Sequence, residues 1–167
     1  MVIVVWRSRV PVRLQPAEYR SGSEESQVYR GDYMVEVQDL VGIPFRNGGR
    51  DSKGYDCWGL VMEVYRRMGI ELPDYPIDAM NTDKISGELL SNQHNWVKIP
   101  EPVEGCLVVM RVSCDRWANH VGVCLNDKTF IHAYANADVC IDRLRRWKGS
   151  TVGFYRPGWL NDRFNSN

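Results

Sequence analysis

The chain has 167 residues, of which 44% are hydrophobic and 25% are charged, so we expect one domain with a sizeable buried core. Lysine plus arginine equals aspartate plus glutamate at 21 each, a balance that excludes the global basic field of a nucleic-acid-binding protein. The five cysteines are odd in number and include no C-x-x-C pair, which argues against a disulfide framework and favours synthesis in a reducing compartment.

The first 31 residues predict a strand followed by a polar loop. The apolar run Met1–Trp6 stops at Arg7, so it is too short for a membrane span or for the apolar part of a signal peptide. Residues 1–14 predict a β-strand with Pro11 at an edge, and residues 15–31 predict a loop. We therefore expect neither membrane insertion nor a signal peptide. If the protein acts outside the cytoplasm, we expect it to leave by another route.

A first helix is predicted from Tyr33 to Val41, with Asp32 as its N-cap and Gly42 as its stop. Its expected buried face consists of Met34, Val37 and Val41. The turn-rich connection Ile43–Gly49 then leads toward the next helix.

The clearest element is a helix that begins at Cys57. Five apolar side chains recur at helical spacing and predict one buried stripe: Leu60, Val61, Val64, Tyr65 and Met68. Asp56 is a suitable N-cap, and Gly69 with Ile70 can form a left-handed stop. Cys57 thus takes the first helical position, where the helix dipole favours a thiolate. The alternative is an ordinary buried structural cysteine.

The second half of the chain predicts strands at short spacing. Before it, residues 77–95 give a weak signal, and one helix from Thr82 to about Asn92 is our interpretation. Trp96–Ile99 alternates weakly, and the clearer strands, expected to form an antiparallel meander, are Leu107–Val112, His120–Leu125, Thr129–Tyr134, Val139–Leu144 and Val152–Arg156. Helices followed by strands predict an α+β domain, with the helices packed on a five- to six-stranded antiparallel sheet.

Two of the three histidines fall on adjacent predicted strands. His120 begins one strand, and His132 lies on the next, across a turn at Asn126-Asp127. A two-residue loop there would place the two imidazoles on opposite faces of the sheet, whereas a three-residue loop would place them on the same face. In the second arrangement His120 can accept the proton of Cys57 while His132 holds its ring. In the first they are two unrelated strand histidines.

Three segments together resemble the motif blocks of the NlpC family of cell-wall cysteine peptidases: Gly54–Val61, His120–Val123 and Phe130–Ala133. Ile43–Gly49 is similar to the family's block before the nucleophile, and the resemblance runs from about residue 32 to residue 157. We therefore expect a peptidase domain over residues 32–160, between an N-terminal segment 1–31 and a polar tail 161–167.

The resemblance implies a papain-like fold with Cys57 as nucleophile, His120 as general base and acid, and His132 as the orienting residue. It implies no metal or other cofactor. The substrate would be a peptidoglycan stem peptide, cut between D-γ-glutamate and the diamino acid. The Cys-Trp-Gly-Leu-Val version of the motif, followed by Gly69–Tyr75, is most similar to phage and prophage tail-associated members. A place in a phage tail, in contact with other tail proteins, is therefore expected.

Three positions depart from the family's usual pattern. Phe45 stands where members commonly carry a tyrosine whose hydroxyl points into the site, so the expected substrate and oxyanion region of Phe45, Asp56 and Trp58 lacks that donor. Trp58 replaces a serine, and it either narrows the cleft or anchors the helix as a core aromatic residue. Cys106 replaces an aspartate that generally ends a turn, with little expected effect on catalysis.

Three other functions are consistent with parts of the pattern. A zinc site could use Cys114, His120 and Cys124 with Cys106 or His132, although the spacings match no common zinc motif. A structural tail component could retain the fold without activity, which Phe45 favours. A papain-like amidase or acyltransferase could use the same triad on another acyl substrate.

Overall fold

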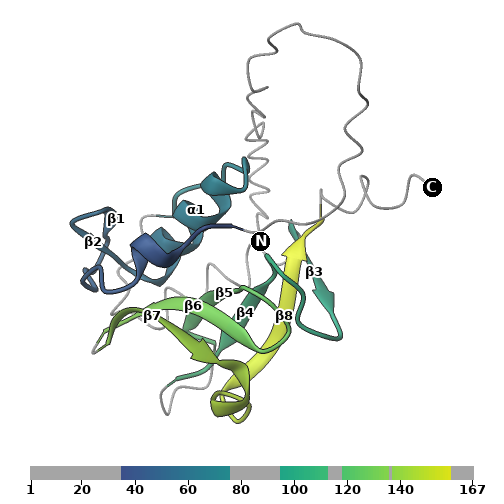
Figure 1. Ribbon diagram of the computed structural model, residues 1–167. Helices are drawn as coiled ribbons and strands as arrows, with labels where there is room; N and C mark the ends of the chain where they lie inside the picture. Colours follow the sequence, from purple (N-terminus) through teal and green to yellow (C-terminus); the bar gives the residue numbers. More distant parts are fainter. Residues whose placement is uncertain (1–34, 76–94, 113–117, 136, 159–167) are drawn as a thin grey trace, which may run out of the picture.

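The computed structural model describes residues 35–75, 95–112, 118–135 and 137–158. In these residues one α-helix, α1 (Cys57–Arg67), lies against one face of a six-stranded sheet (Figure 1). The strands of the sheet are β3 (Trp96–Ile99), β4 (Leu107–Met110), β5 (His120–Cys124), β6 (Thr129–Tyr134), β7 (Asp138–Arg143) and β8 (Thr151–Pro157). A small hairpin of β1 (Arg50–Asp51) and β2 (Gly54–Tyr55) precedes α1.

The strand order is β3-β8-β4-β5-β6-β7, and every pairing between neighbours is antiparallel. The predicted α+β class with a five- to six-stranded antiparallel sheet is confirmed. The simple meander is wrong at its end, because β8 pairs with β4 and β3 instead of β7. All four residues of β4 are buried, because this apolar strand lies between β8 and β5 inside the sheet.

The residues at both ends of α1 explain why the helix has these bounds. The Asp56 side chain accepts a hydrogen bond from the Gly59 N–H at 2.6 Å, as the predicted N-cap requires. At the other end Gly69 has φ +74°, and the Ile70 N–H donates to the Tyr65 carbonyl at 2.9 Å. The predicted start at Cys57 and the glycine stop are therefore confirmed. No helix in the described part of the chain has the length and apolar character needed to span a membrane.

Two apolar clusters hold the domain together, one on each face of the sheet. The cluster under α1 includes Leu60, Val61 and Val64 of the helix, packed against Val121, Val123, Ile131 and Ala133 of the sheet. Each such side chain contributes about 1.5–3 kcal/mol when fully buried. The second cluster, on the opposite face, includes Val108, Met110, Phe130 and Leu144, with Trp147 packed against it. Residues that alternate along one strand therefore belong to different clusters.

The predicted helix over Tyr33–Val41 is wrong for the residues that the structure describes. Residues 35–37 are irregular, and only Gln38–Leu40 form a single 3-10 turn, η1; a second such turn, η3, is Leu144–Arg146. Val37 and Leu40 are buried, whereas Val41 is 44% exposed. One turn buries only these two side chains, and the left-handed Gly42, φ +85°, ends it. The predicted strand 1–14, the helix Thr82–Asn92 and the tail 161–167 lie outside the described residues.

Gly122 of β5 allows the side chains of β6 to lie close to it. A Cβ atom at this position would meet the Ile131 carbonyl oxygen and the Phe130 ring, both at 2.8 Å, and the His132 Cβ at 3.1 Å. We expect Gly122→Ala to lower the free energy of unfolding by about 1–3 kcal/mol, because backbone cannot move aside as a flexible side chain can. Urea unfolding measures this change. Gly149→Ala is the matched control, since nothing lies within 4 Å of a Cβ there, and equal effects of the two substitutions would contradict this account.

Candidate active site

The candidate nucleophile lies where the start of α1 meets β5. Cys57 is the first residue of α1, and only 6% of it is exposed. It belongs to the apolar cluster that also contains Val121, the residue that directly follows His120. The backbone N–H groups of Val121, Trp58 and Cys57 itself favour the thiolate form of the sulfur. The sulfur is therefore adjacent to the backbone of β5 at the residue next to His120.

A buried ion pair holds the loop before Cys57 in place. Asp56 is 1% exposed, and besides capping α1 its carboxylate accepts the Gly48 N–H at 3.1 Å and pairs with Arg50 at 2.7 Å. Arg50 also pairs with Asp74 at 2.9 Å and donates to the Tyr75 carbonyl at 3.2 Å. One carboxylate and one guanidinium thus join three segments around the nucleophile.

The other two residues expected in the oxyanion region have structural partners. The Trp58 indole N–H donates to the Pro73 carbonyl at 3.1 Å, and its ring contacts Tyr75 and Trp96 with centroids 5.2 Å and 6.5 Å away. Of the two predicted roles for Trp58, this geometry fits the aromatic anchor, since its only donor is already used. Phe45 is half-buried against the core, and its N–H donates to Asp138 at 3.1 Å.

The loop between β5 and β6 decides which face carries the histidines. The Leu125 N–H donates to the Thr129 carbonyl at 2.9 Å, and Cys124 pairs with Phe130, so the loop has the three residues 126–128. The Asn126 side chain accepts from the N–H groups of Lys128 and Thr129, at 2.8 Å and 2.9 Å, and fixes the turn. The odd loop length puts both imidazoles on one face. His120 Nε2 and His132 Nδ1 are 2.8 Å apart, as the predicted orienting contact requires.

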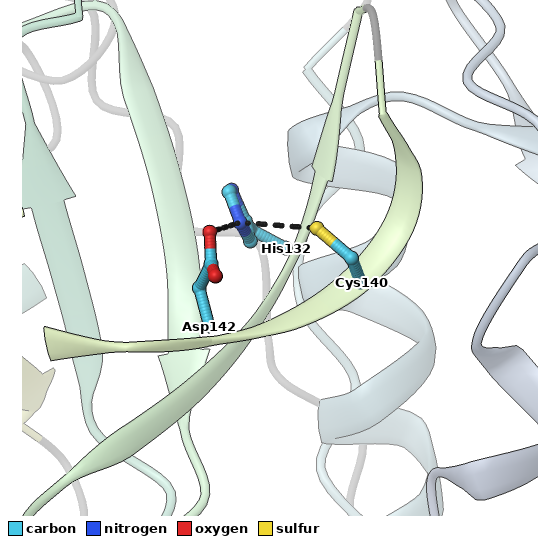
Figure 2. Close-up of side chains that lie close together, drawn as sticks. All are labelled: His132, Cys140 and Asp142. Atoms are coloured by element: carbon cyan, nitrogen blue, oxygen red, sulfur yellow. Dashed lines mark hydrogen bonds and ion pairs between the residues drawn. The ribbon is translucent and has the colours of Figure 1, made fainter. Parts of the chain in front are cut away.

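The far side of His132 contacts two residues of β7 (Figure 2). His132 Nε2 lies 3.4 Å from Asp142 Oδ2 and 3.3 Å from Cys140 Sγ. Asp142 Oδ2 also accepts the Trp147 indole N–H at 3.0 Å. A line of polar contacts therefore runs from the Asp142 carboxylate through both imidazoles.

His120 and the body of α1 lie on opposite faces of the sheet. His120 pairs directly with Met110 of the second cluster, whereas its neighbour Val121 packs under the helix. Among the described residues, no hydrogen bond joins the Cys57 sulfur to His120. β5 and β6 pair at the loop end of these strands, through Val123–Ile131 and Cys124–Phe130. The contact with His132 uses Nε2, so Nδ1 is the nitrogen of His120 left to serve a thiol.

Burial keeps the candidate residues uncharged. Desolvation raises the pKa of the Cys57 thiol to about 12, and the Asp56 carboxylate adds to the increase. Desolvation, followed by the charge of His132, lowers the pKa of His120 to about 3. Desolvation also lowers the pKa of His132, against the opposing effect of Asp142. Burial of Cys57 thus opposes the effect of the helix dipole, which favours the thiolate form.

Sequence reasoning missed Arg50, Cys140 and Asp142. The last two are two residues apart on β7, and Cys140 pairs with His132 across the strands, so a correct register for this hairpin would have found them. The group that the described residues bring within ligand distance is His132, Cys140 and Asp142, not the predicted zinc set around His120 and Cys124. Cys114 of that set lies outside the described residues.

The buried histidines predict how stability depends on pH. An unfolded histidine titrates near pH 6.5, whereas folded His120 stays neutral until about pH 3. Between these values the unfolded chain binds more protons, so the free energy of unfolding decreases as the pH falls from about 6.5 toward 3. Urea unfolding at a series of pH values measures this slope. We expect His120→Gln to reduce it, and an unchanged slope in that variant would contradict the account.

The chain is similar in sequence to two curated proteins. Tail tip assembly protein K of Escherichia phage N15 is 36% identical over 85 residues, which are 47% of this chain and 34% of that protein. Murein DD-endopeptidase MepS/Murein LD-carboxypeptidase of Escherichia coli K12 is 29% identical over 118 residues, which are 69% of this chain and 56% of that protein. The chain therefore spans between about a third and somewhat over half of the length of these two relatives.

Solved structures give the same fold. An NLP/P60 family protein of Staphylococcus aureus aligns with a TM-score of 0.56 at 22% identity, over 81% of this chain and 45% of that one. An NlpC/P60 family protein of Bacillus cereus aligns with a TM-score of 0.54 at 22% identity, over 71% of this chain and 36% of that one. The NlpC/P60 family model matches residues 42–156. Since this match covers more than half of the chain, the protein belongs to the NlpC/P60 family.

Proposed function

We propose that this protein is a cysteine peptidase that hydrolyses an amide bond in the stem peptides of peptidoglycan. Cys57 is the nucleophile, His120 the general base and acid, and His132 the residue that orients His120. The observation that carries the proposal is the 2.8 Å contact between the buried imidazoles of His120 and His132. Val121, the residue after His120, lies beside the Cys57 sulfur.

The proposal assigns each proton from the contacts of His132. Asp142 Oδ2 can only accept and the Cys140 sulfur can accept weakly, so the proton of His132 is assigned to Nε2, and His132 Nδ1 is left as an acceptor. His120 then donates its own proton from Nε2 to His132 and keeps a lone pair on Nδ1. This is the tautomer that a base acting on Cys57 needs. Asp142 acts through His132, so its role is positioning.

The reaction starts from a neutral thiol and a neutral imidazole. As the Cys57 sulfur bonds to the substrate carbonyl carbon, its proton moves to His120 Nδ1. The resulting imidazolium gives this proton to the leaving amine as the amide C–N bond breaks, which forms a thioester. A water molecule then attacks the thioester, loses a proton to His120, and releases the carboxylic acid and the thiol. The Cys57 backbone N–H, at the positive end of α1, is the oxyanion donor in this scheme.

Two kinds of support bear on the bond that is cut. The resemblance of the motif blocks points to the bond between D-γ-glutamate and the diamino acid, whereas the matched Escherichia coli relative is named as a DD-endopeptidase and LD-carboxypeptidase. Digestion products of intact stem peptides distinguish these bonds. The match to a phage tail tip assembly protein supports a place in a phage tail, with other tail proteins as partners and the cell wall as the site of action.

A structural tail component that retains the fold is the second candidate. Phe45 supplies no hydroxyl in the substrate region, and Cys57 forms no hydrogen bond with His120 in the described structure, which favours this alternative. An amidase or acyltransferase with the same triad and another acyl substrate is the third. Neither alternative needs a change in the fold.

Purified muropeptides test the proposal directly. We expect one amide bond to be cut, and Cys57→Ala or His120→Ala to abolish cleavage while thermal unfolding shows an intact fold. His132→Ala should leave a residual rate, because an orienting residue is less essential than a base. Equal losses at all three positions would contradict the assigned roles. Absence of cleavage together with slow alkylation of Cys57 would support the structural component, and turnover of other acyl groups alone would support the third candidate.

The role of Asp142 has its own test. We expect Asp142→Ala to lower kcat by about tenfold or more with little change in KM, because substrate contacts remain while the tautomer of His120 is no longer fixed. The carboxylate raises the pKa of His132, so its removal should also move the acid limb of the kcat profile to lower pH. Asp127→Ala, in the exposed loop, is the matched control. A fall in kcat without a shift in the profile would assign Asp142 a merely structural role.

A further inference from the structure

We infer that His132, Cys140 and Asp142 form a binding site for a thiophilic divalent cation such as Zn²⁺, and that the bound cation switches the catalytic site off. His132 of β6 faces Cys140 of β7, and Asp142 lies two residues further along β7 (Figure 2). Their ligand atoms all lie within 4.8 Å of one another. Metal binding at these residues is independent of the proposed function, whereas inhibition by the bound metal rests on it.

Two of the three separations between the ligand atoms match those around a tetrahedral zinc ion. With metal–ligand bonds of about 2.0–2.3 Å, two ligands at a tetrahedral angle lie roughly 3.3–3.6 Å apart. His132 Nε2 is 3.3 Å from Cys140 Sγ and 3.4 Å from Asp142 Oδ2. The ligand atoms of Cys140 and Asp142 lie within 4.8 Å of each other, so a cation can bind once these two side chains close around it.

The chemistry of the three ligands selects the class of metal. An imidazole, a thiol and a carboxylate together suit zinc, whereas magnesium and calcium prefer oxygen ligands alone. A thiolate and a carboxylate also neutralise the two charges of the ion. Cys140 and the Asp142 side chain, which is 26% exposed, give access to solvent, so water can supply the fourth ligand.

The neighbours of the three ligands resemble the outer shell of a metal site. Metal-bound imidazoles usually donate from their second nitrogen, and ligating carboxylates are usually hydrogen-bonded. His132 Nδ1 contacts His120 at 2.8 Å, and Asp142 Oδ2 accepts the Trp147 indole N–H at 3.0 Å. Arg146, 3.7 Å from Asp142 Oδ1, is the cation that competes for this carboxylate.

Metal binding reverses the order of protons in the catalytic pair. The cation takes the lone pair at His132 Nε2, so the proton held there moves to Nδ1, and the thiol proton of Cys140 goes to solvent. His132 then donates from Nδ1 to His120 Nε2, and the proton of His120 moves to Nδ1. A nitrogen that already carries a proton cannot accept one from Cys57. The metal-bound protein is therefore inactive without any metal contact to the nucleophile.

Binding is tested on the full chain in a Cys57→Ala background, which removes the catalytic thiol as a competing ligand. We expect one Zn²⁺ to bind in competition with a chromophoric chelator, and Co²⁺ to give a thiolate charge-transfer band. Adding Cys140→Ala should weaken binding by at least about tenfold, because one of the three metal ligands is lost, and should abolish the band. Cys106→Ala, which removes a buried thiol elsewhere, is the matched control. A zinc-dependent rise in Tm shows that each variant is folded and binds.

Inhibition is measured separately, as the ratio of each variant's activity with and without Zn²⁺. We expect Cys140→Ala to lose most of the inhibition that the unmodified protein shows. Metal binding that disappears with Cys57→Ala but survives Cys140→Ala would overturn the inference, and so would no binding at all. If the protein binds zinc through Cys140 but cleaves no muropeptide, the proposed function fails and the metal site stands.

Discussion

The hydrogen bond between the two buried imidazoles is the interaction on which the rest of the site depends. At 2.8 Å one nitrogen must donate and the other must accept, and burial makes a charge on either ring costly. The direction of this bond is set by what lies beyond His132. In the proposed mechanism a carboxylate there directs the protons so that His120 can act as a base, and in the proposed metal-bound state a cation directs them the opposite way. Both proposals give one strand, β7, control over the chemistry assigned to the start of α1.

The position of the nucleophile depends on a different interaction. Asp56 caps α1 and pairs with Arg50, which in turn reaches Asp74 and the Tyr75 carbonyl. The helix start is therefore fixed by charged groups that are themselves held in place. The burial of Cys57 favours its thiol form, so the proposed mechanism relies on a base to activate it.

The sequence predicted the elements that carry strong local signals. The apolar stripe, the N-cap and the glycine stop placed α1 correctly, and period-two patterns placed β6 within its observed bounds. The position of β8 could not be predicted, since strand order depends on packing between distant segments. A difference of one residue in the length of the β5–β6 loop decides whether the two histidines share a face of the sheet. The Asn126 side chain stabilises the observed three-residue loop. Cys140 and Asp142 were missed because their importance comes from cross-strand register and not from any motif.

The tautomers of the two histidines test the central claim most directly. In metal-free protein labelled with ¹⁵N, two-bond nitrogen–proton correlations of the imidazole rings show which nitrogen carries the proton. The account predicts that both rings are neutral at neutral pH, each with its proton on Nε2. A proton on Nδ1 of His120 would contradict it, because the nitrogen assigned to accept the thiol proton would already be occupied.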